Sequence, residues 1–164
     1  MIHHTGAPNA HQDTTTNYCS SGYDFHVRWG GAIVVCARWA DNSGAHASGC
    51  NCKSIGIMMN GCFGGCTSGN VAAPSNAQEC SVAYLLAHLG TPLYDESRLR
   101  PHANCAGWNP CGDPSPTTTV CCGTNLTQSS GGFYNWNSNG QAFRTRLWAK
   151  ASNWKQYGCC DRVC

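Results

Sequence analysis

Two of the seven histidines in the sequence stand where a metal ligand would be useful. His3 and His4 are adjacent in a short apolar stretch, and the alternation of side chains along a strand allows only one of them to face a given site. His102 leads into a loop, and loops beside a sheet commonly carry functional side chains. A catalytic zinc ion needs three protein ligands and one open position for water. His3 and His102 with one further ligand could form such a site, although their spacing alone is weak support.

Three residues that follow His102 could supply the third ligand: Cys105, Cys111 and Asp113. Zinc accepts thiolate, imidazole and carboxylate ligands, so none of the three is excluded by its chemistry. A zinc ion in such a site would lower the pKa of a water molecule and polarise a carbonyl group. The chemistry that these residues suggest is therefore hydrolysis.

Cysteine is unusually abundant, with 14 residues in a chain of 164. The number is even, as complete pairing requires, and the chain lacks the repeated C-x2-C knuckles of structural zinc domains. We therefore predict a disulfide-rich protein, and because disulfides do not persist in a reducing cytosol, we expect it to be secreted or periplasmic. The pairing cannot be read from the sequence.

The elements that must position these residues follow from hydrophobic periodicity. Ser75-x-x-Gln78 is a capping box and starts the clearest helix, which Gly90 and Pro92 end. Tyr23, Phe25, Val27 and Trp29 alternate with Asp24, His26 and Arg28, which predicts a half-buried strand followed by a Gly30-Gly31 turn. Further strands are expected over 2–5, 32–39 and 54–60, the last covered on both faces, and a second helix over 139–152, with Phe143, Leu147 and Trp148 inward and Arg144, Arg146 and Lys150 outward. Residues 6–21, with one helical turn at most, 40–53 and 103–137 are expected to be loops.

This pattern predicts an α/β fold in which a mixed central β-sheet is flanked by helices, in a single domain over 1–164. The net charge is +2 and we find no cluster of Lys and Arg, so we expect no nucleic-acid partner. No apolar run approaches the ~18 residues of a membrane-spanning helix. The chain opens directly on a strand, and we interpret Met1 as a trimmed start from which any export signal has been removed.

Three motifs in this order resemble a known superfamily. They are Ile2-His3-His4-Thr5, Gly22-Tyr23-Asp24-Phe25, and Gly44-Ala45-His46-Ala47 leading into Ser54-Ile55-Gly56-Ile57. Together they resemble the peptidoglycan recognition protein and type 2 N-acetylmuramoyl-L-alanine amidase superfamily, and the resemblance covers residues 2–115. The last motif is the most specific. Residues 116–164 would then form a disulfide-stapled loop and a C-terminal helix.

The resemblance implies roles for individual residues. His3 and His102 match the two histidine ligands of a zinc ion, Tyr23 matches a residue that assists the water or the tetrahedral intermediate, and His46 would line the substrate groove. Trp39 could stack on a sugar ring, with a core position as the other interpretation. Met58 stands where some members carry a glutamate acid/base.

The third ligand departs from the family's usual spacing. Asp113 is favoured over Cys111 because Asp-Pro-Ser-Pro resembles the Asp-Pro-Gly-Pro of some members, and because a zinc-bound cysteine would leave an odd number for pairing. Asn109 would stand at the oxyanion-stabilising position if Cys111 were the ligand, and it could donate a hydrogen bond there.

The function that the resemblance implies is zinc-dependent hydrolysis of the amide bond between N-acetylmuramic acid and L-alanine in peptidoglycan. The expected partners are peptidoglycan or muropeptides, and we expect a monomer. The main alternative is a peptidoglycan-binding recognition protein without activity, since such members have typically lost the third ligand. A third possibility is a disulfide-rich structural or toxin-like secreted protein.

Overall fold

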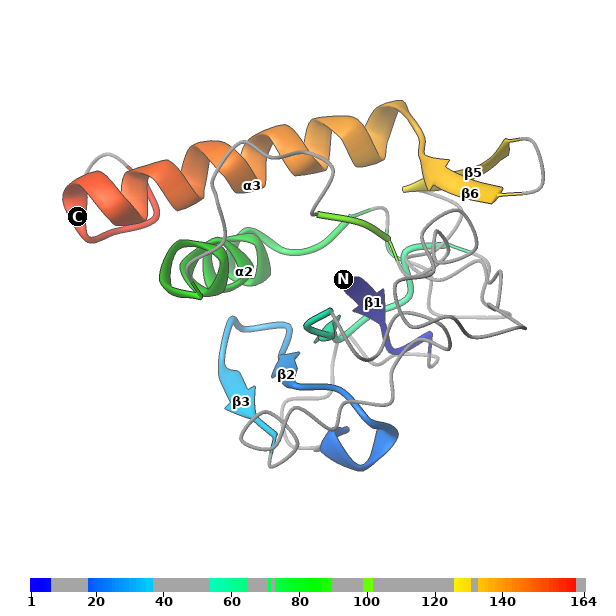
Figure 1. Ribbon diagram of the computed structural model, residues 1–164, viewed down its shortest axis with the longest axis horizontal. Helices are drawn as coiled ribbons and strands as arrows, with labels where there is room; N and C mark the ends of the chain where they lie inside the picture. Colours follow the sequence, from blue (N-terminus) through cyan, green and yellow to red (C-terminus); the bar gives the residue numbers. More distant parts are fainter. Residues whose placement is uncertain are drawn as a thin grey trace.

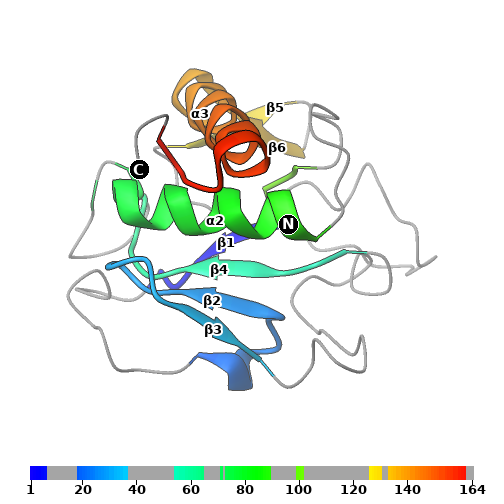
Figure 2. The same cartoon turned by 90° about the vertical axis from the view of Figure 1, so that its left-hand side faces the viewer.

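A computed structural model describes residues 1–6, 18–36, 54–64, 71, 73–89, 99–101, 126–130 and 133–161. The elements in chain order are β1 (Ile2–His4), the 3-10 turn η1 (Cys19–Ser21), β2 (Phe25–Val27), β3 (Ile33–Val35), β4 (Ile57–Met59), α2 (Asn76–His88), β5 (Thr127–Ser130), β6 (Phe133–Trp136) and α3 (Ser138–Tyr157). Figures 1 and 2 show that these elements form layers. The main sheet lies against α2, and α3 lies on the side of α2 that faces away from the sheet.

The main sheet has the strand order β1-β4-β2-β3. β4 pairs in parallel with both β1 and β2, whereas β3 is antiparallel to β2, so the sheet is mixed, as predicted. All three residues of β4 are buried. This confirms the prediction that the apolar run at 54–60 contributes a central strand with both faces covered.

The two faces of the sheet have different composition. Ile2, Phe25 and Ile57 share a register position and belong to the hydrophobic core that also contains Val82 and Leu86 of α2. By alternation, the next position in each strand points the other way. We call this second surface the His3 face, because it carries the neighbouring residues His3, Met58 and His26.

The strand expected over 23–29 differs from its prediction in length and in burial. It is shorter, since β2 covers only Phe25–Val27. It was interpreted as half-buried, with Asp24 and His26 on an open face, but Asp24 is 3% and His26 0% exposed. The His3 face is therefore covered here. Alternation of polar and apolar residues shows which face of a strand is polar. It shows that this face is exposed to solvent only when its polar side chains lack partners within the protein.

The Gly30-Gly31 turn joins β2 to β3, as predicted. The Arg28 amide donates to the carbonyl of Ala32 over 2.9 Å, and Gly31 has a φ of +89° that favours glycine. A Cβ at Gly31 would lie 3.0 Å from the carbonyl oxygen of Ala77, so this turn fits closely against α2. β3 is shorter than the strand expected over 32–39, and residues 37–39 lie outside the described residues.

The capping box that was predicted for α2 is present. The Ser75 hydroxyl accepts from the Gln78 amide, and the Gln78 side chain accepts from the Ser75 amide, each over 3.1 Å. The Gln78 side chain also donates to the carbonyl of Asn60 over 2.8 Å, which ties the start of α2 to the end of β4. The helix ends at His88, which agrees with the predicted stop before Gly90.

The C-terminal helix α3 extends five residues beyond the predicted 152 and ends at Gly158, whose φ of +72° is the usual left-handed cap. Phe143, Leu147 and Trp148 are buried, as predicted. The prediction for Arg144 was wrong, because this residue is only 7% exposed. Arg144 stands three and four residues before Leu147 and Trp148, so it lies on the same face of the helix as these buried side chains.

Residues 103–137 were predicted to be a loop, and this was wrong for 127–130 and 133–136. These two segments form the antiparallel strand pair β5–β6, and Gly131-Gly132 stands between them in the sequence. Gly-Gly between two β-prone stretches is a recognised hairpin signal, which the high Thr, Asn and Gly content of the surrounding segment obscures. The Asn137 amide donates to the carbonyl of Leu126 over 2.9 Å and joins the hairpin to the start of α3.

The cysteines that the structure describes confirm the prediction of disulfides. Cys19 is bonded to Cys36, and Cys80 to Cys160. Cys62 and Cys159 are also disulfide-bonded. Within the described ranges, no helix is long and apolar enough to cross a membrane.

Candidate functional site

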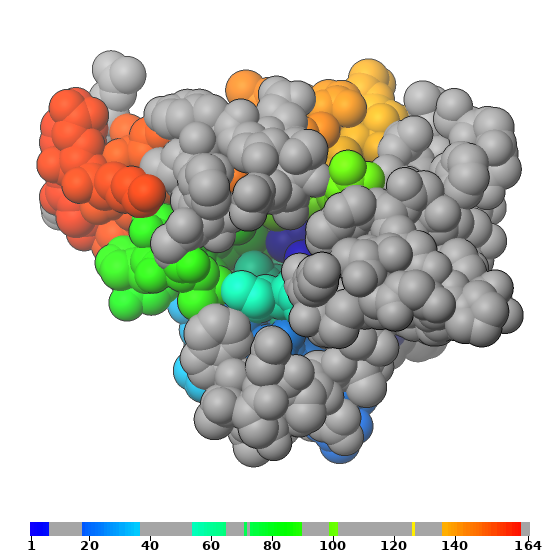
Figure 3. Space-filling model, viewed as in Figure 1, coloured from blue at the N-terminus to red at the C-terminus, as the bar shows by residue number. Residues whose placement is uncertain are grey.

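His3 is held rigidly in the middle of β1. The strand is fixed on both sides, because Ile2 donates to the carbonyl of Arg100 over 2.9 Å and Ile57 donates to the carbonyl of Met1 over 2.8 Å. The His3 side chain is 0% exposed. In the space-filling view, only a small patch of the blue N-terminal residues is visible beside α2 (Figure 3). A buried imidazole on a paired strand has little rotamer freedom, which suits a metal ligand.

His4 points to the opposite face and has a structural role. Its Nδ1 atom accepts a hydrogen bond from the Phe63 amide over 3.1 Å, and the two rings stack with centroids 5.8 Å apart. One ring nitrogen of His4 is therefore committed to holding the turn that follows β4. Of the two adjacent histidines, His3 alone is on the His3 face.

Tyr23 lies against His3. Their ring centroids are 4.8 Å apart and the rings meet edge to face at 66°. Tyr23 precedes β2 instead of belonging to it, so its orientation is set by the turn η1 and not by strand alternation. The structure thus brings together the two described residues that the sequence analysis assigned to metal binding and to catalysis.

Asp24 anchors the backbone immediately after Tyr23. Its carboxylate accepts from the Gly56 amide over 2.7 Å, and its own amide donates to the Gly56 carbonyl over 3.1 Å. Burial raises the pKa of the Asp24 carboxyl above its ordinary value of 3.8, while the Gly56 hydrogen bond and the positive charge of the N-terminus act in the opposite direction. Asp24 therefore fixes the entry into β2 at the start of β4.

A second buried histidine lies on the His3 face, and the sequence analysis missed it. His26 is separated from His3 by Met58 in the sheet register, its Nε2 atom is hydrogen-bonded to the Asn60 side chain, and the ring of Tyr18 meets it edge to face at 5.2 Å. The sequence did contain a signal for His26 as a site residue. His26 alternates with the apolar residues of its strand, and it therefore faces the same side of the sheet as His3.

The other predicted site residues lie outside the described residues. These are His102, Asp113 and the alternative Cys111 for the metal, and Trp39, His46 and Asn109 for the substrate. Their roles stay predictions.

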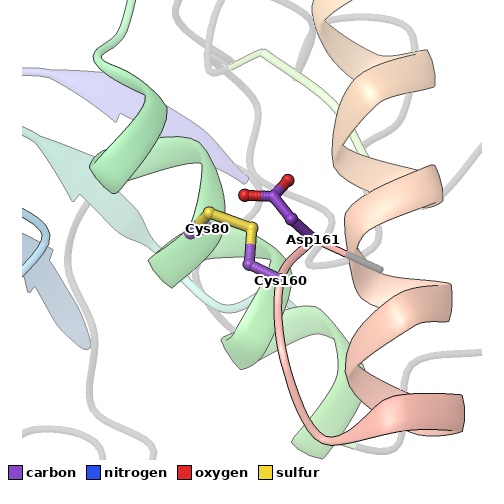
Figure 4. Close-up of side chains that lie close together, drawn as sticks. All are labelled: Cys80, Cys160 and Asp161. Carbon is purple, nitrogen blue, oxygen red and sulfur yellow. A yellow bond between two sulfur atoms is a disulfide. The ribbon is translucent and has the colours of Figure 1, made fainter. Parts of the chain in front are cut away.

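One group of potential metal ligands lies elsewhere, at the junction of α2 and α3. Cys80, Cys160 and Asp161 have ligand atoms within 4.8 Å of one another. Figure 4 shows the two sulfur atoms joined to each other, and zinc binds the thiolate form of cysteine, which a disulfide does not provide. Asp161 is paired with Lys150 over 3.3 Å. This group is therefore a structural staple and does not fit a zinc ion.

The described part of the chain thus defines a class: a mixed α/β sheet with helices on one face and a buried histidine with a tyrosine against it on the other. A family model described as N-acetylmuramoyl-L-alanine amidase matches residues 1–121. The chain belongs to this family, which confirms the resemblance seen in its motifs. The match includes β1 to β4 and α2, whereas β5, β6 and α3 lie beyond it. No curated protein and no solved structure matches the chain.

Proposed function

We propose that this protein is a secreted, monomeric zinc hydrolase that cleaves the amide bond between the lactyl group of N-acetylmuramic acid and L-alanine in peptidoglycan. Family membership supports amidase-type activity or peptidoglycan recognition in general. The observation that carries the more specific proposal is the 4.8 Å contact of Tyr23 with the buried His3. It unites a ligand-type imidazole and a hydroxyl donor at one point of a rigid sheet.

In this proposal the zinc ligands are His3, His102 and Asp113, with Cys111 as the alternative to Asp113. Two imidazoles and one carboxylate are a donor set that catalytic zinc uses. His3 fits the role, because it is a buried imidazole on the face opposite the hydrophobic core. When bound, zinc would supply Lewis acidity for the carbonyl and a more acidic water molecule.

The chain's own residues would orient the reactants. Hydrolysis adds water to the lactyl carbonyl carbon, breaks the C–N bond and delivers a proton to the departing amino group of L-alanine. The Tyr23 hydroxyl would hydrogen-bond the attacking water or the oxygen on which negative charge develops. His46 and Trp39 would contact the stem peptide and the sugar, and Asn109 is a further donor.

The test begins with metal content, using a matched pair of variants at adjacent positions. We expect close to one zinc ion per chain in the wild type, loss of zinc in His3→Asn, and retention in His4→Asn. The asparagine at position 4 keeps an acceptor for the Phe63 amide. The two variants therefore carry the same substitution and differ mainly in the face of the sheet on which it lies. A wild-type protein that takes up no zinc when zinc is supplied would refute the proposal.

Activity is the second measurement. The wild-type protein should release stem peptides with a free L-alanine amino terminus from purified peptidoglycan. The Tyr23→Phe variant should release them at a rate at least about 10²-fold lower. Zinc retention in Asp113→Ala against Cys111→Ser identifies the third ligand. Zinc binding without any peptide release would instead identify a recognition protein.

A further inference from the structure

Tyr23 lies within a short loop that is closed on itself. The loop comprises residues 19–24, and Cys36 closes it in two ways. The Cys36 sulfur is bonded to Cys19 at one end, and the Cys36 amide donates to the carbonyl of Asp24 over 2.9 Å at the other. Cys36 itself is 2% exposed and follows β3. We call residues 19–24 with this closure the Cys36-closed loop.

The contacts within the Cys36-closed loop restrict the backbone conformation on both sides of Tyr23. η1 occupies its first half, and Gly22 donates to the Cys19 carbonyl over 3.2 Å with a φ of +93°. Asp24 fixes the other end on Gly56. Tyr23 is therefore the residue between a turn closed by a disulfide and an anchor on the central strand.

The Cys36-closed loop also lies on the appropriate side of the sheet. Both views place η1 away from α2 and α3 (Figures 1 and 2). Tyr18, immediately before the loop, meets His26, and Tyr23, within it, meets His3. One short segment thus covers both buried histidines of the His3 face, and a change in its backbone would move Tyr23 relative to His3.

We propose that the Cys19–Cys36 disulfide is a positioning element for the reaction, which holds the Tyr23 hydroxyl in its working place through the Cys36-closed loop. This inference rests on the proposed role of Tyr23. The effect would be transmitted through the backbone of residues 19–24 and not through contact of either cysteine with substrate. A misplacement of about 1 Å in a catalytic group can cost on the order of 10²-fold in rate.

The test compares two disulfides. In Cys19→Ser/Cys36→Ser we expect kcat to fall by about 10- to 100-fold with KM within about twofold. In Cys80→Ser/Cys160→Ser, which removes the staple between α2 and α3, we expect kcat within about twofold of wild type at a temperature where both variants are folded by circular dichroism. In a Tyr23→Phe background, removal of Cys19–Cys36 should cause no further loss, because the two changes act through the same hydroxyl.

The proposal would be overturned if removal of the Cys19–Cys36 disulfide lowered kcat by the same factor in the Tyr23→Phe background as in wild type. It would also be overturned if removal left the wild-type kcat unchanged. If the double serine variant does not fold, Cys19→Ala/Cys36→Ala takes its place, because it also removes the disulfide and does not bury a hydroxyl at the 2% exposed position 36. The nuclear Overhauser contact between the rings of Tyr23 and His3 provides a readout without activity. Its presence in wild type and loss in the variant supports the positioning role even in a protein without amidase activity, whereas its persistence refutes the role.

Discussion

Gly140 offers a prediction in which helix propensity and packing disagree in sign. It is the third residue of α3, and propensity alone predicts that Gly140→Ala stabilises the helix by about 0.5–1 kcal/mol. A Cβ at this position would lie 2.2 Å from the carbonyl oxygen of Leu126 and 2.7 Å from Cε3 of Trp136. Leu126 presents backbone, which cannot move aside as a flexible side chain can.

The magnitude follows from what must shift. Restoring ordinary contact requires the start of α3 to move away from Leu126 by about 1 Å. This movement stretches the 2.9 Å hydrogen bond from the Asn137 amide to the Leu126 carbonyl, which is worth about 1 kcal/mol. Overpacking of a buried site costs about 1–3 kcal/mol. After the helix gain is subtracted, we expect a net loss of about 1–3 kcal/mol and a fall in Tm of about 3–10 °C.

Thermal and urea unfolding with the disulfides intact would measure this loss. Gly30→Ala is the matched control, because nothing lies within 4 Å of a Cβ built there, and we expect its stability within about 1 kcal/mol of wild type. A Gly140→Ala protein as stable as wild type, or more stable, would show that the close approach of α3 to Leu126 is not as described.

Three further predictions concern charged side chains, two of them at Asp24 and one at the Glu79–Arg146 pair. Asp24→Ala should lower the free energy of unfolding by about 1–3 kcal/mol more than Asp24→Asn, because asparagine keeps an acceptor for the Gly56 amide. Urea unfolding of the two variants at pH 7 would measure this difference. Because burial raises the pKa of Asp24, the folded protein binds this proton more tightly than the unfolded chain, so wild type should lose stability relative to Asp24→Asn as the pH rises from about 4 through the raised pKa. The Glu79 carboxylate accepts three hydrogen bonds from Arg146, at 2.6, 3.0 and 3.2 Å. A double-mutant cycle with Glu79→Gln and Arg146→Met should give a coupling free energy of about 1–2 kcal/mol, and a value near zero would contradict the pair.

The parts of the fold that local chemistry specifies could be predicted from the sequence. The capping box at Ser75 and Gln78 fixed the start of α2, and the apolar run at 54–60 predicted the central strand. The choice between His3 and His4 was correctly framed as a choice between faces, but alternation alone cannot say which face holds the core. That depends on the side where α2 packs, which is a tertiary property.

The missed features depend on contacts between distant parts of the chain. His26, for example, is buried because Tyr18 and Asn60 reach it from other parts of the chain. The pairing of Cys19 with Cys36 could not be deduced from the cysteine count, since parity restricts how many cysteines pair and not which. The Cys36-closed loop could not be predicted either, because it is defined by this pairing.

The Cys80–Cys160 bond has a consequence for survival among proteases. It joins residues 80 positions apart, so a single cut anywhere between them leaves two fragments that remain covalently linked. The Glu79–Arg146 ion pair holds the same two helices together beside the bond. A nicked molecule would thus keep its C-terminal helix, would migrate at full mass on a non-reducing gel, and would separate into two pieces only after reduction.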